Sequence, residues 1–269
     1  MTFARRAPLV LAPAVAGLAL AGCAWGGPPA ASATAPAAGP ALSGDLVVFA
    51  AASLQRTFSV IGDELMAQHP GLRVTFNFGS SGTLTQQLLA GAPADVYASA
   101  STRTMADAAA VTNRPQVVAH NSLVIAVPAG NPAGVTGLAD FTRADLELAL
   151  CDESAPCGAA ARTVFARAGL VPAPDTYGQD ATATLALVTR DEVDAALVYR
   201  TDAIAAGDAV ETVPVPQAVD VVNDYATATT KDAKNPAAAQ AFVDLVLSPA
   251  GQKVLTDAGF AVDASTAAR

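Results

Sequence analysis

Two serine-bearing segments carry the residues best suited to bind an anion. Ser53 lies in AAASL and Ser81 in GSSGTL, and each segment follows an apolar run and precedes a helical pattern. A helix N-terminus offers free backbone N–H groups and a partial positive charge, and a serine hydroxyl adds one more donor. Serine is also a preferred N-cap, so either segment alone predicts only capping. Two such helix starts that converge predict an anion site built without any cation.

The cysteines and histidines do not form a recognisable catalytic or metal-binding pattern. Cys151 and Cys157 are close in sequence, and a disulfide between them is expected in an oxidising compartment. A nucleophilic cysteine would need a nearby base, and a zinc site would need further ligands. His69 and His120 are the two histidines of the chain, and neither lies in a known catalytic motif. A disulfide is therefore the favoured interpretation.

Three aspartates raise the alternative of an enzyme with paired carboxylates. Asp95, Asp180 and Asp202 each lie at the end of a predicted strand or helix. Aspartate commonly caps backbone N–H groups at such positions. Structural roles are therefore expected for all three, and the chain is not expected to be an enzyme.

The first residues predict export from the cytoplasm. Arg5 and Arg6 precede an apolar stretch that is short for a membrane span, so residues 1–22 are typical of a signal peptide. This stretch ends in LAGC, which resembles a lipobox, and Cys23 would then become a lipid-carrying N-terminus. The alternative is an ordinary secretory signal. Residues 23–43 are rich in Ala and Pro and predict an extended tether.

The rest of the chain alternates between strand and helix patterns. Strands are predicted at residues 45–50, 72–78 and 95–99, with helices between them. This βαβαβ order predicts a mainly parallel sheet flanked by helices, with ligands beyond the carboxyl ends of the strands. A further apolar strand is predicted at 122–127, and a second α/β block follows it, with segments at 146–150, 162–168, 181–189 and 195–199. A strand is then predicted at 219–229, and helices at 236–247 and 249–258.

Composition excludes one class of partner. The chain has a formal charge of −9, 52% hydrophobic residues and a mean hydropathy of +0.37. Nucleic acid is not an expected partner, because its recognition needs a basic face and no Lys/Arg cluster is present. The length beyond residue 45 suffices for two small lobes or one large α/β domain.

Several motifs, in this order and spacing, resemble those of the periplasmic molybdate-binding proteins, which have the type II solute-binding fold. The resemblance covers residues 45–262 and rests on VFAAASL at 48–54, FGSSGTL at 78–84 and GAPADV at 91–96, with LVYRTDA at 197–203, SPAGQ at 248–252 and GF at 259–260. It implies an α/β fold of two lobes, each a mainly parallel sheet flanked by helices, joined by two crossing strands. Lobe 1 would comprise residues 45–124 plus 226–269, and lobe 2 residues 125–225.

The resemblance also implies a ligand set. Ser53 and Ser81 would donate hydroxyl and backbone hydrogens, Tyr199 a phenol hydrogen, and Cys157 and Ala181 backbone N–H groups. The family's usual loop lacks cysteines, so the disulfide of Cys157 with Cys151 is expected to rigidify a binding loop in this chain.

Neutral donors without a matched acceptor suit a fully deprotonated dianion and disfavour phosphate, which keeps a proton near neutral pH. Sulfate, molybdate and tungstate remain, and the resemblance favours molybdate or tungstate. It further implies an extracytoplasmic lipoprotein without a cofactor, monomeric, that delivers its ligand to the permease of an ABC transporter. The alternatives are a binding protein for another oxyanion such as sulfate, or for a metal chelate, and a secreted enzyme on the same fold.

Overall fold

The structure, a computed structural model, describes residues 41–263. The predicted signal peptide, the lipid attachment at Cys23 and the tether up to residue 40 lie outside the described residues. Within residues 41–263, no helix is both long and apolar enough to cross a membrane.

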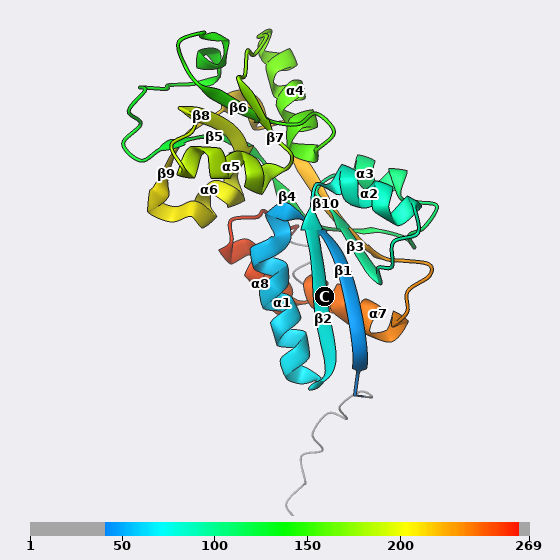
Figure 1. The fold of residues 1–269 in the computed structure, drawn as a ribbon. Helices are drawn as coiled ribbons and strands as arrows, with labels where there is room; N and C mark the ends of the chain where they lie inside the picture. The colour runs from blue at the N-terminus through cyan, green and yellow to red at the C-terminus, as the bar shows by residue number, and fades with distance from the viewer. Residues whose placement is uncertain (1–40, 264–269) are drawn as a thin grey trace, which may run out of the picture. The chain divides into compact units, whose positions relative to one another are not determined.

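Five strands form the first sheet, in the order β2-β1-β3-β10-β4. Their bounds are β1 Ser43–Ala51, β2 Gly71–Gly79, β3 Val96–Ser99, β4 Gln116–Asn121 and β10 Asn223–Thr229. The helices that pack on this sheet are α1 Gln55–Gln68, α2 Ser81–Leu89, α3 Thr102–Asp107 and α7 Pro236–Leu247, and α8 Pro249–Asp257 packs against α1 and α7. Helices α2 and α3 lie side by side, as do α7 and α8 (Figure 1).

Helix α1 shows why these residues form this packing. Its apolar side chains Phe58, Ile61 and Leu65 recur at helical spacing and are at most 2% exposed. The ring of Phe58 meets that of Phe242 from α7 edge to face, at 5.4 Å between centroids. The helix ends at Gln68, because Pro70 disfavours a helical conformation of the residue before it.

Five strands form the second sheet, in the order β7-β6-β8-β5-β9. Their bounds are β5 Leu123–Pro128, β6 Leu148–Cys151, β7 Thr176–Gly178, β8 Ala195–Tyr199 and β9 Val210–Val213. Helices α4 Pro156–Ala168, α5 Ala181–Thr189 and α6 Arg200–Ala206 pack on it. Short 3₁₀ helices at Ala52–Leu54, Leu138–Thr142, Gly207–Ala209 and Pro216–Ala218 complete the described structure.

The predicted α/β fold with helices on sheets is confirmed, but each sheet is mixed rather than mainly parallel. In the first sheet β1 pairs with β2 and β3 in parallel, whereas β10 pairs with β3 and β4 antiparallel. The second sheet repeats this arrangement, with β5 antiparallel to both β8 and β9. The reversed strands are β5 and β10, the two that directly follow a crossing, since a chain that arrives from the other sheet enters against the direction of the βαβ strands.

The chain passes between the sheets twice. It first crosses at Ser122, which separates β4 from β5, and it returns between β9 and β10. The strand predicted at 219–229 begins later, at Asn223, because the preceding apolar residues do not join the sheet: Val219 is 70% exposed and Val222 is 49% exposed. Pro216 opens a 3₁₀ turn just before them.

Candidate functional site

A small cavity of about 10 Å³ lies among the carboxyl ends of parallel strands from both sheets. Residues at or after the ends of β1, β2 and β3 form one wall, and residues at or after the ends of β6, β7 and β8 form the other. This is the position at which α/β sheets bind ligands, because the helices that follow the strands present their N-termini there. The lining contains no lysine or arginine.

The cavity brings the five predicted ligand residues together. All of them line it: Ser53, Ser81, Cys157, Ala181 and Tyr199. They come from segments far apart in the chain, and only the packing of the two sheets makes them neighbours. Their contact with a ligand stays a prediction.

Three helices begin at the cavity wall. Helix α2 begins at Ser81, α4 at Pro156 and α5 at Ala181. The first N–H groups of a helix have no partner within it, and together they carry a partial positive charge. Neither α2 nor α4 has a side chain that caps its N-terminus. Backbone dipoles therefore supply the positive potential here.

Ser81 is held in a defined orientation. Its side chain is buried, and its Oγ accepts a hydrogen bond from the N–H of Ala100 at 3.0 Å. A backbone N–H can only donate, so the hydroxyl hydrogen of Ser81 stays free for another acceptor.

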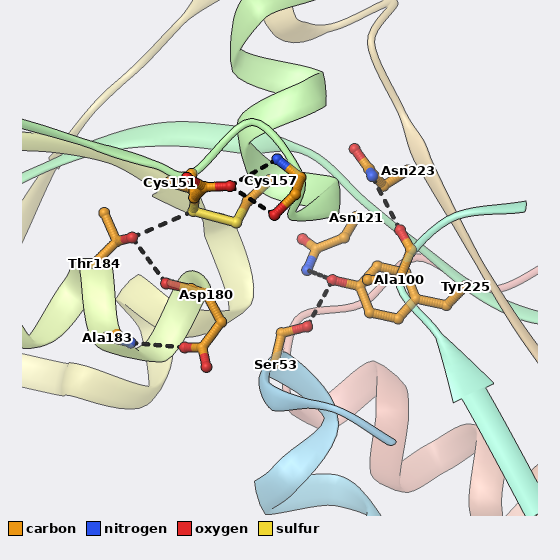
Figure 2. The surroundings of a disulfide bond; sticks show 12 residues. Ser53, Ala100, Asn121, Cys151, Cys157, Asp180, Ala183, Thr184, Asn223 and Tyr225 are labelled. Carbon is orange, nitrogen blue, oxygen red and sulfur yellow. Dashed lines mark hydrogen bonds between the residues drawn. A yellow bond between two sulfur atoms is a disulfide. The ribbon is translucent and has the colours of Figure 1, made fainter. Parts of the chain in front are cut away.

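Ser53 contacts a second tyrosine. Its Oγ lies 2.8 Å from the hydroxyl of Tyr225, which belongs to β10 (Figure 2). The sequence did not indicate a role for Tyr225, because none of the motifs that resemble those of the molybdate-binding proteins contains it.

Tyr199 is the most informative side chain of the site. It is 1% exposed, and its hydroxyl has no hydrogen-bond partner among residues 41–263. Its ring meets that of Tyr225 edge to face, at 5.8 Å between centroids. Burial raises the pKa of the Tyr199 phenol well above its ordinary value, so the group stays protonated and is a donor.

Ser80 is a further candidate that the sequence did not single out. It is 7% exposed, lines the cavity, and its hydroxyl has no partner in the described part of the chain. It occupies the N-cap position of α2, yet its side chain makes no capping bond. The sequence shows that two serines are adjacent, but it does not show which of their hydroxyls lacks a partner beside the cavity.

Two of the three aspartates take the structural roles expected of them. Asp95 accepts from the N–H groups of Val47 at 2.8 Å and Asn235 at 2.9 Å. Asp180 caps α5 by accepting from the N–H of Ala183 at 2.8 Å (Figure 2). All three bonds satisfy backbone donors.

Asp202 meets the capping prediction only in part. It lies in the first turn of α6, where its carboxyl accepts from the N–H of the N-cap residue Tyr199. It is 8% exposed, and its Oδ2 has no hydrogen-bond partner within the described residues. Burial, together with the nearby charge of Asp180, raises the pKa of Asp202 to about 7. A carboxyl buried without a full set of donors favours its neutral form.

Asp202→Asn is expected to stabilise the protein in a pH-dependent way. The folded state binds the proton more tightly than the unfolded state, so wild-type stability falls as pH rises from the unfolded value of 3.8 to about 7. Chemical unfolding should show the advantage of the variant growing by about 1 kcal/mol or more between pH 5 and pH 8. An advantage that does not change with pH would contradict this assignment, and the exposed Asp244→Asn is the control.

A disulfide joins Cys151 at the end of β6 to Cys157 in the first turn of α4, with 5.8 Å between the Cα atoms. The turn it closes is tight, since a Cβ on Gly158 would overlap the carbonyl oxygen of Asp152. Thr184 of α5 contacts the Cys151 sulfur at 3.3 Å (Figure 2). The disulfide therefore holds the start of α4 in place at the cavity wall.

Reduction of this disulfide is expected to weaken oxyanion binding by roughly threefold to tenfold, because the start of α4 would no longer be fixed before the ligand arrives. Calorimetric titration of oxidised and reduced protein measures the effect, and a Cys151→Ser/Cys157→Ser double variant should match the reduced protein. Equal affinities for the oxidised and reduced forms would show that the disulfide does not organise the site.

The histidines lie apart from the cavity lining. His69 accepts from the N–H of Leu42 at 3.3 Å, and His120 contacts Asp224 at 2.7 Å and Asp263 at 3.3 Å. No group of three or more His, Cys, Asp or Glu side chains in residues 41–263 is arranged to hold a metal ion.

Comparison with known proteins gives consistent results. The model of the family described as bacterial extracellular solute-binding protein matches residues 46–261. Molybdate-binding protein ModA of Mycobacterium tuberculosis strain H37Rv is 40% identical over 256 residues, which cover 94% of this chain and 96% of that protein. The ModA protein of Escherichia coli is 30% identical over 241 residues, which cover 81% of this chain and 90% of that protein.

Among solved structures, the periplasmic molybdate-binding protein of Azotobacter vinelandii superposes with a TM-score of 0.67 at 19% identity. The superposition covers 81% of this chain and 99% of that chain. At that identity the likeness shows the fold alone, and it agrees with the two mixed sheets described above.

Proposed function

The chain belongs to the bacterial extracellular solute-binding proteins, and from that premise we propose that it captures molybdate, or tungstate, in the cavity between the two sheets. The matched family comprises solute-binding proteins, and the relatives from Mycobacterium tuberculosis and Escherichia coli carry the name molybdate-binding protein. The ligand is a tetrahedral dianion, and no cofactor takes part.

The observation that carries this proposal is the pair of buried hydroxyls without partners. The hydroxyls of Tyr199 and Ser80 both belong to residues that line the cavity, and neither has a hydrogen-bond partner among the described residues. Leaving a buried polar group unsatisfied costs about 1–3 kcal/mol. A dianion whose oxygens all accept would satisfy them together with the N–H groups of the helix starts.

We further propose that Ser53, Ser81 and Tyr199 donate side-chain hydrogens to the ligand, and that Cys157 and Ala181 donate backbone N–H groups. Pro156 has no N–H, so Cys157 carries the first such donor of α4. Asp180 accepts from Ala183, which leaves the N–H of Ala181 available. These donors come from both sides of the cavity.

The proposed mechanism is closure of two lobes, with lobe 1 at residues 45–124 plus 226–269 and lobe 2 at 125–225. A cavity of about 10 Å³ has room for one water-sized sphere, so its walls must part to admit an ion with four oxygens. A ligand that bridges both lobes favours the closed form, because only that form supplies all of its contacts.

The family places the protein outside the cytoplasm. The finer assignments are part of the proposal: lipid attachment at Cys23, monomeric action, delivery of the ion to an ABC permease, and the absence of enzymatic activity. The lining supports the last of these, since it offers hydroxyls, backbone and one carboxylate but no general base beside a nucleophile.

Calorimetric titration of residues 41–269 with molybdate, tungstate, sulfate and phosphate tests the function. We expect tight binding of molybdate and tungstate, weaker binding of sulfate and none of phosphate. A sulfate affinity equal to that for molybdate would overturn the choice of ligand and leave a general binder of oxyanions.

A further inference from the structure

A hydrogen-bonded chain of side chains leads away from Ser53. Its Oγ lies 2.8 Å from the hydroxyl of Tyr225, and that hydroxyl lies 3.4 Å from Nδ2 of Asn121 (Figure 2). The same amide nitrogen donates to Oγ1 of Thr201 at 2.8 Å. Tyr225 and Asn121 lie where the two crossings leave the first sheet, and Thr201 belongs to α6 of the second.

The orientation of the Asn121 amide is fixed by the backbone. Its Oδ1 accepts from the N–H of Ser122 at 3.0 Å. The amide nitrogen therefore faces Tyr225 and Thr201, and its two hydrogens serve these two oxygens. An amide nitrogen donates and does not accept.

This orientation decides the direction of the next hydrogen bond. Tyr225 is 0% exposed, and burial raises the pKa of its phenol above the ordinary value, so the hydroxyl keeps its hydrogen. That hydrogen cannot point at the donating amide of Asn121. The acceptor it has within the described residues is Oγ of Ser53.

Ser53 consequently receives a hydrogen bond and keeps its own hydrogen for another acceptor. Ser81 is in the same situation, because its Oγ accepts from the N–H of Ala100. The two serines differ in the source of this bond. A backbone group orients Ser81, whereas a chain of side chains orients Ser53 and can be changed by substitution.

We propose that Tyr225 is a positioning residue, oriented by Asn121, that fixes the Ser53 hydroxyl as a donor toward the oxyanion in the cavity. The inference rests on the proposed function and goes beyond it, since neither residue lines the cavity. Without the donor from Tyr225, the Ser53 hydroxyl could turn its hydrogen elsewhere, and the free protein would have to reorient it on binding.

A double-mutant cycle tests this inference. Tyr225→Phe keeps the ring contacts with Tyr199 and Phe260 and removes the hydroxyl alone. We expect it to weaken oxyanion binding by about threefold to tenfold in the wild-type background, the usual range for one hydrogen bond. In a Ser53→Ala background the same change should cost less than about twofold, because no hydroxyl remains to be oriented.

The cycle is run with whichever of molybdate, tungstate or sulfate titrates the unaltered protein, so a wrong choice among them does not affect it. Thermal unfolding without ligand shows that each variant is folded. The control is Thr112→Val, which removes a buried hydroxyl outside the cavity lining and should leave affinity unchanged.

Equal losses from Tyr225→Phe in both backgrounds would overturn the positioning role, since they would show that Tyr225 acts without Ser53. An unchanged affinity of Tyr225→Phe would overturn it as well. No titration of the wild-type protein by any of the three ions would overturn the proposed function itself, and this inference with it.

Discussion

Tyr199→Phe should weaken molybdate binding by about 10-fold to 100-fold and at the same time stabilise the protein without ligand. A hydrogen bond to a charged group contributes about 1.5–3 kcal/mol, which corresponds to that loss of affinity. The stability effect has the opposite sign, because the hydroxyl is buried without a partner among the described residues and its removal relieves the cost of burying it. Calorimetric titration measures the first effect, and chemical unfolding without ligand measures the second.

Tyr97→Phe is the matched control. Tyr97 is as buried as Tyr199, with 0% of its surface exposed against 1%. Its hydroxyl, however, lies 2.8 Å from Oγ1 of Thr85 and donates to the carbonyl of Ser81 at 3.0 Å. Its removal should therefore lower the stability of the free protein by about 1 kcal/mol. A loss of stability in Tyr199→Phe similar to that of Tyr97→Phe would contradict the assignment of Tyr199 as a donor reserved for the ligand.

Gly82→Ala should weaken ligand binding by about 10-fold to 100-fold, because it destabilises only the closed form. Overpacking usually costs about 1–3 kcal/mol, which corresponds to this loss of affinity. A Cβ at Gly82 in α2 would lie 2.7 Å from the carbonyl oxygen of Ser154, in the turn between β6 and α4. These segments belong to different sheets, so the clash forces them apart. The free protein should keep its stability, because alanine favours a helix more than glycine does.

Two measurements separate this effect from general damage. X-ray scattering should show compaction of the wild-type protein on addition of molybdate and little compaction of Gly82→Ala. Gly137→Ala is the control, because a Cβ there meets nothing within 4 Å, and it should bind like the wild type. Full compaction and unchanged affinity of Gly82→Ala would contradict closure by approach of α2 to this turn.

Local patterns were sufficient to predict most of the elements that position the site. The helix that carries Phe58 and Ile61 was visible as apolar residues at helical spacing, and the residues 181–189 and 195–199 have the predicted bounds in the structure. The start of α2 at Ser81 followed from a serine and glycine pair after an apolar strand. These features depend on a few adjacent residues, which is why the sequence alone determines them.

The parts that were wrong or missed depend on contacts between distant segments. The direction of β10 against β3 follows from the path of the chain between the two sheets, and no local pattern contains it. Val219 and Val222 look like strand residues but are exposed, because Pro216 turns the chain before the sheet begins. Asp202 was expected to cap a helix, but no local pattern showed that its carboxyl would be buried with one oxygen that has no partner in the described region.

The site shows the same division. The segments of Ser53 and Ser81 were recognisable in the sequence as candidates for anion binding, and the resemblance supplied Tyr199 as a further candidate. Ser80 and Tyr225 were missed, because their importance lies in which way a hydroxyl points and in what lies beside it. Those properties arise only when the loops after six strands meet.

A crystal grown with tungstate tests the central claim most directly, because anomalous scattering from tungsten locates the ion without reference to any assumed ligand residue. We predict one strong peak in the cavity lined by Ser53, Ser81 and Tyr199, with the ion's oxygens within hydrogen-bond distance of these hydroxyls and of the N–H groups at Cys157 and Ala181. A strong peak elsewhere on the protein, or no peak in this cavity, would contradict capture of the oxyanion by neutral donors between the two sheets.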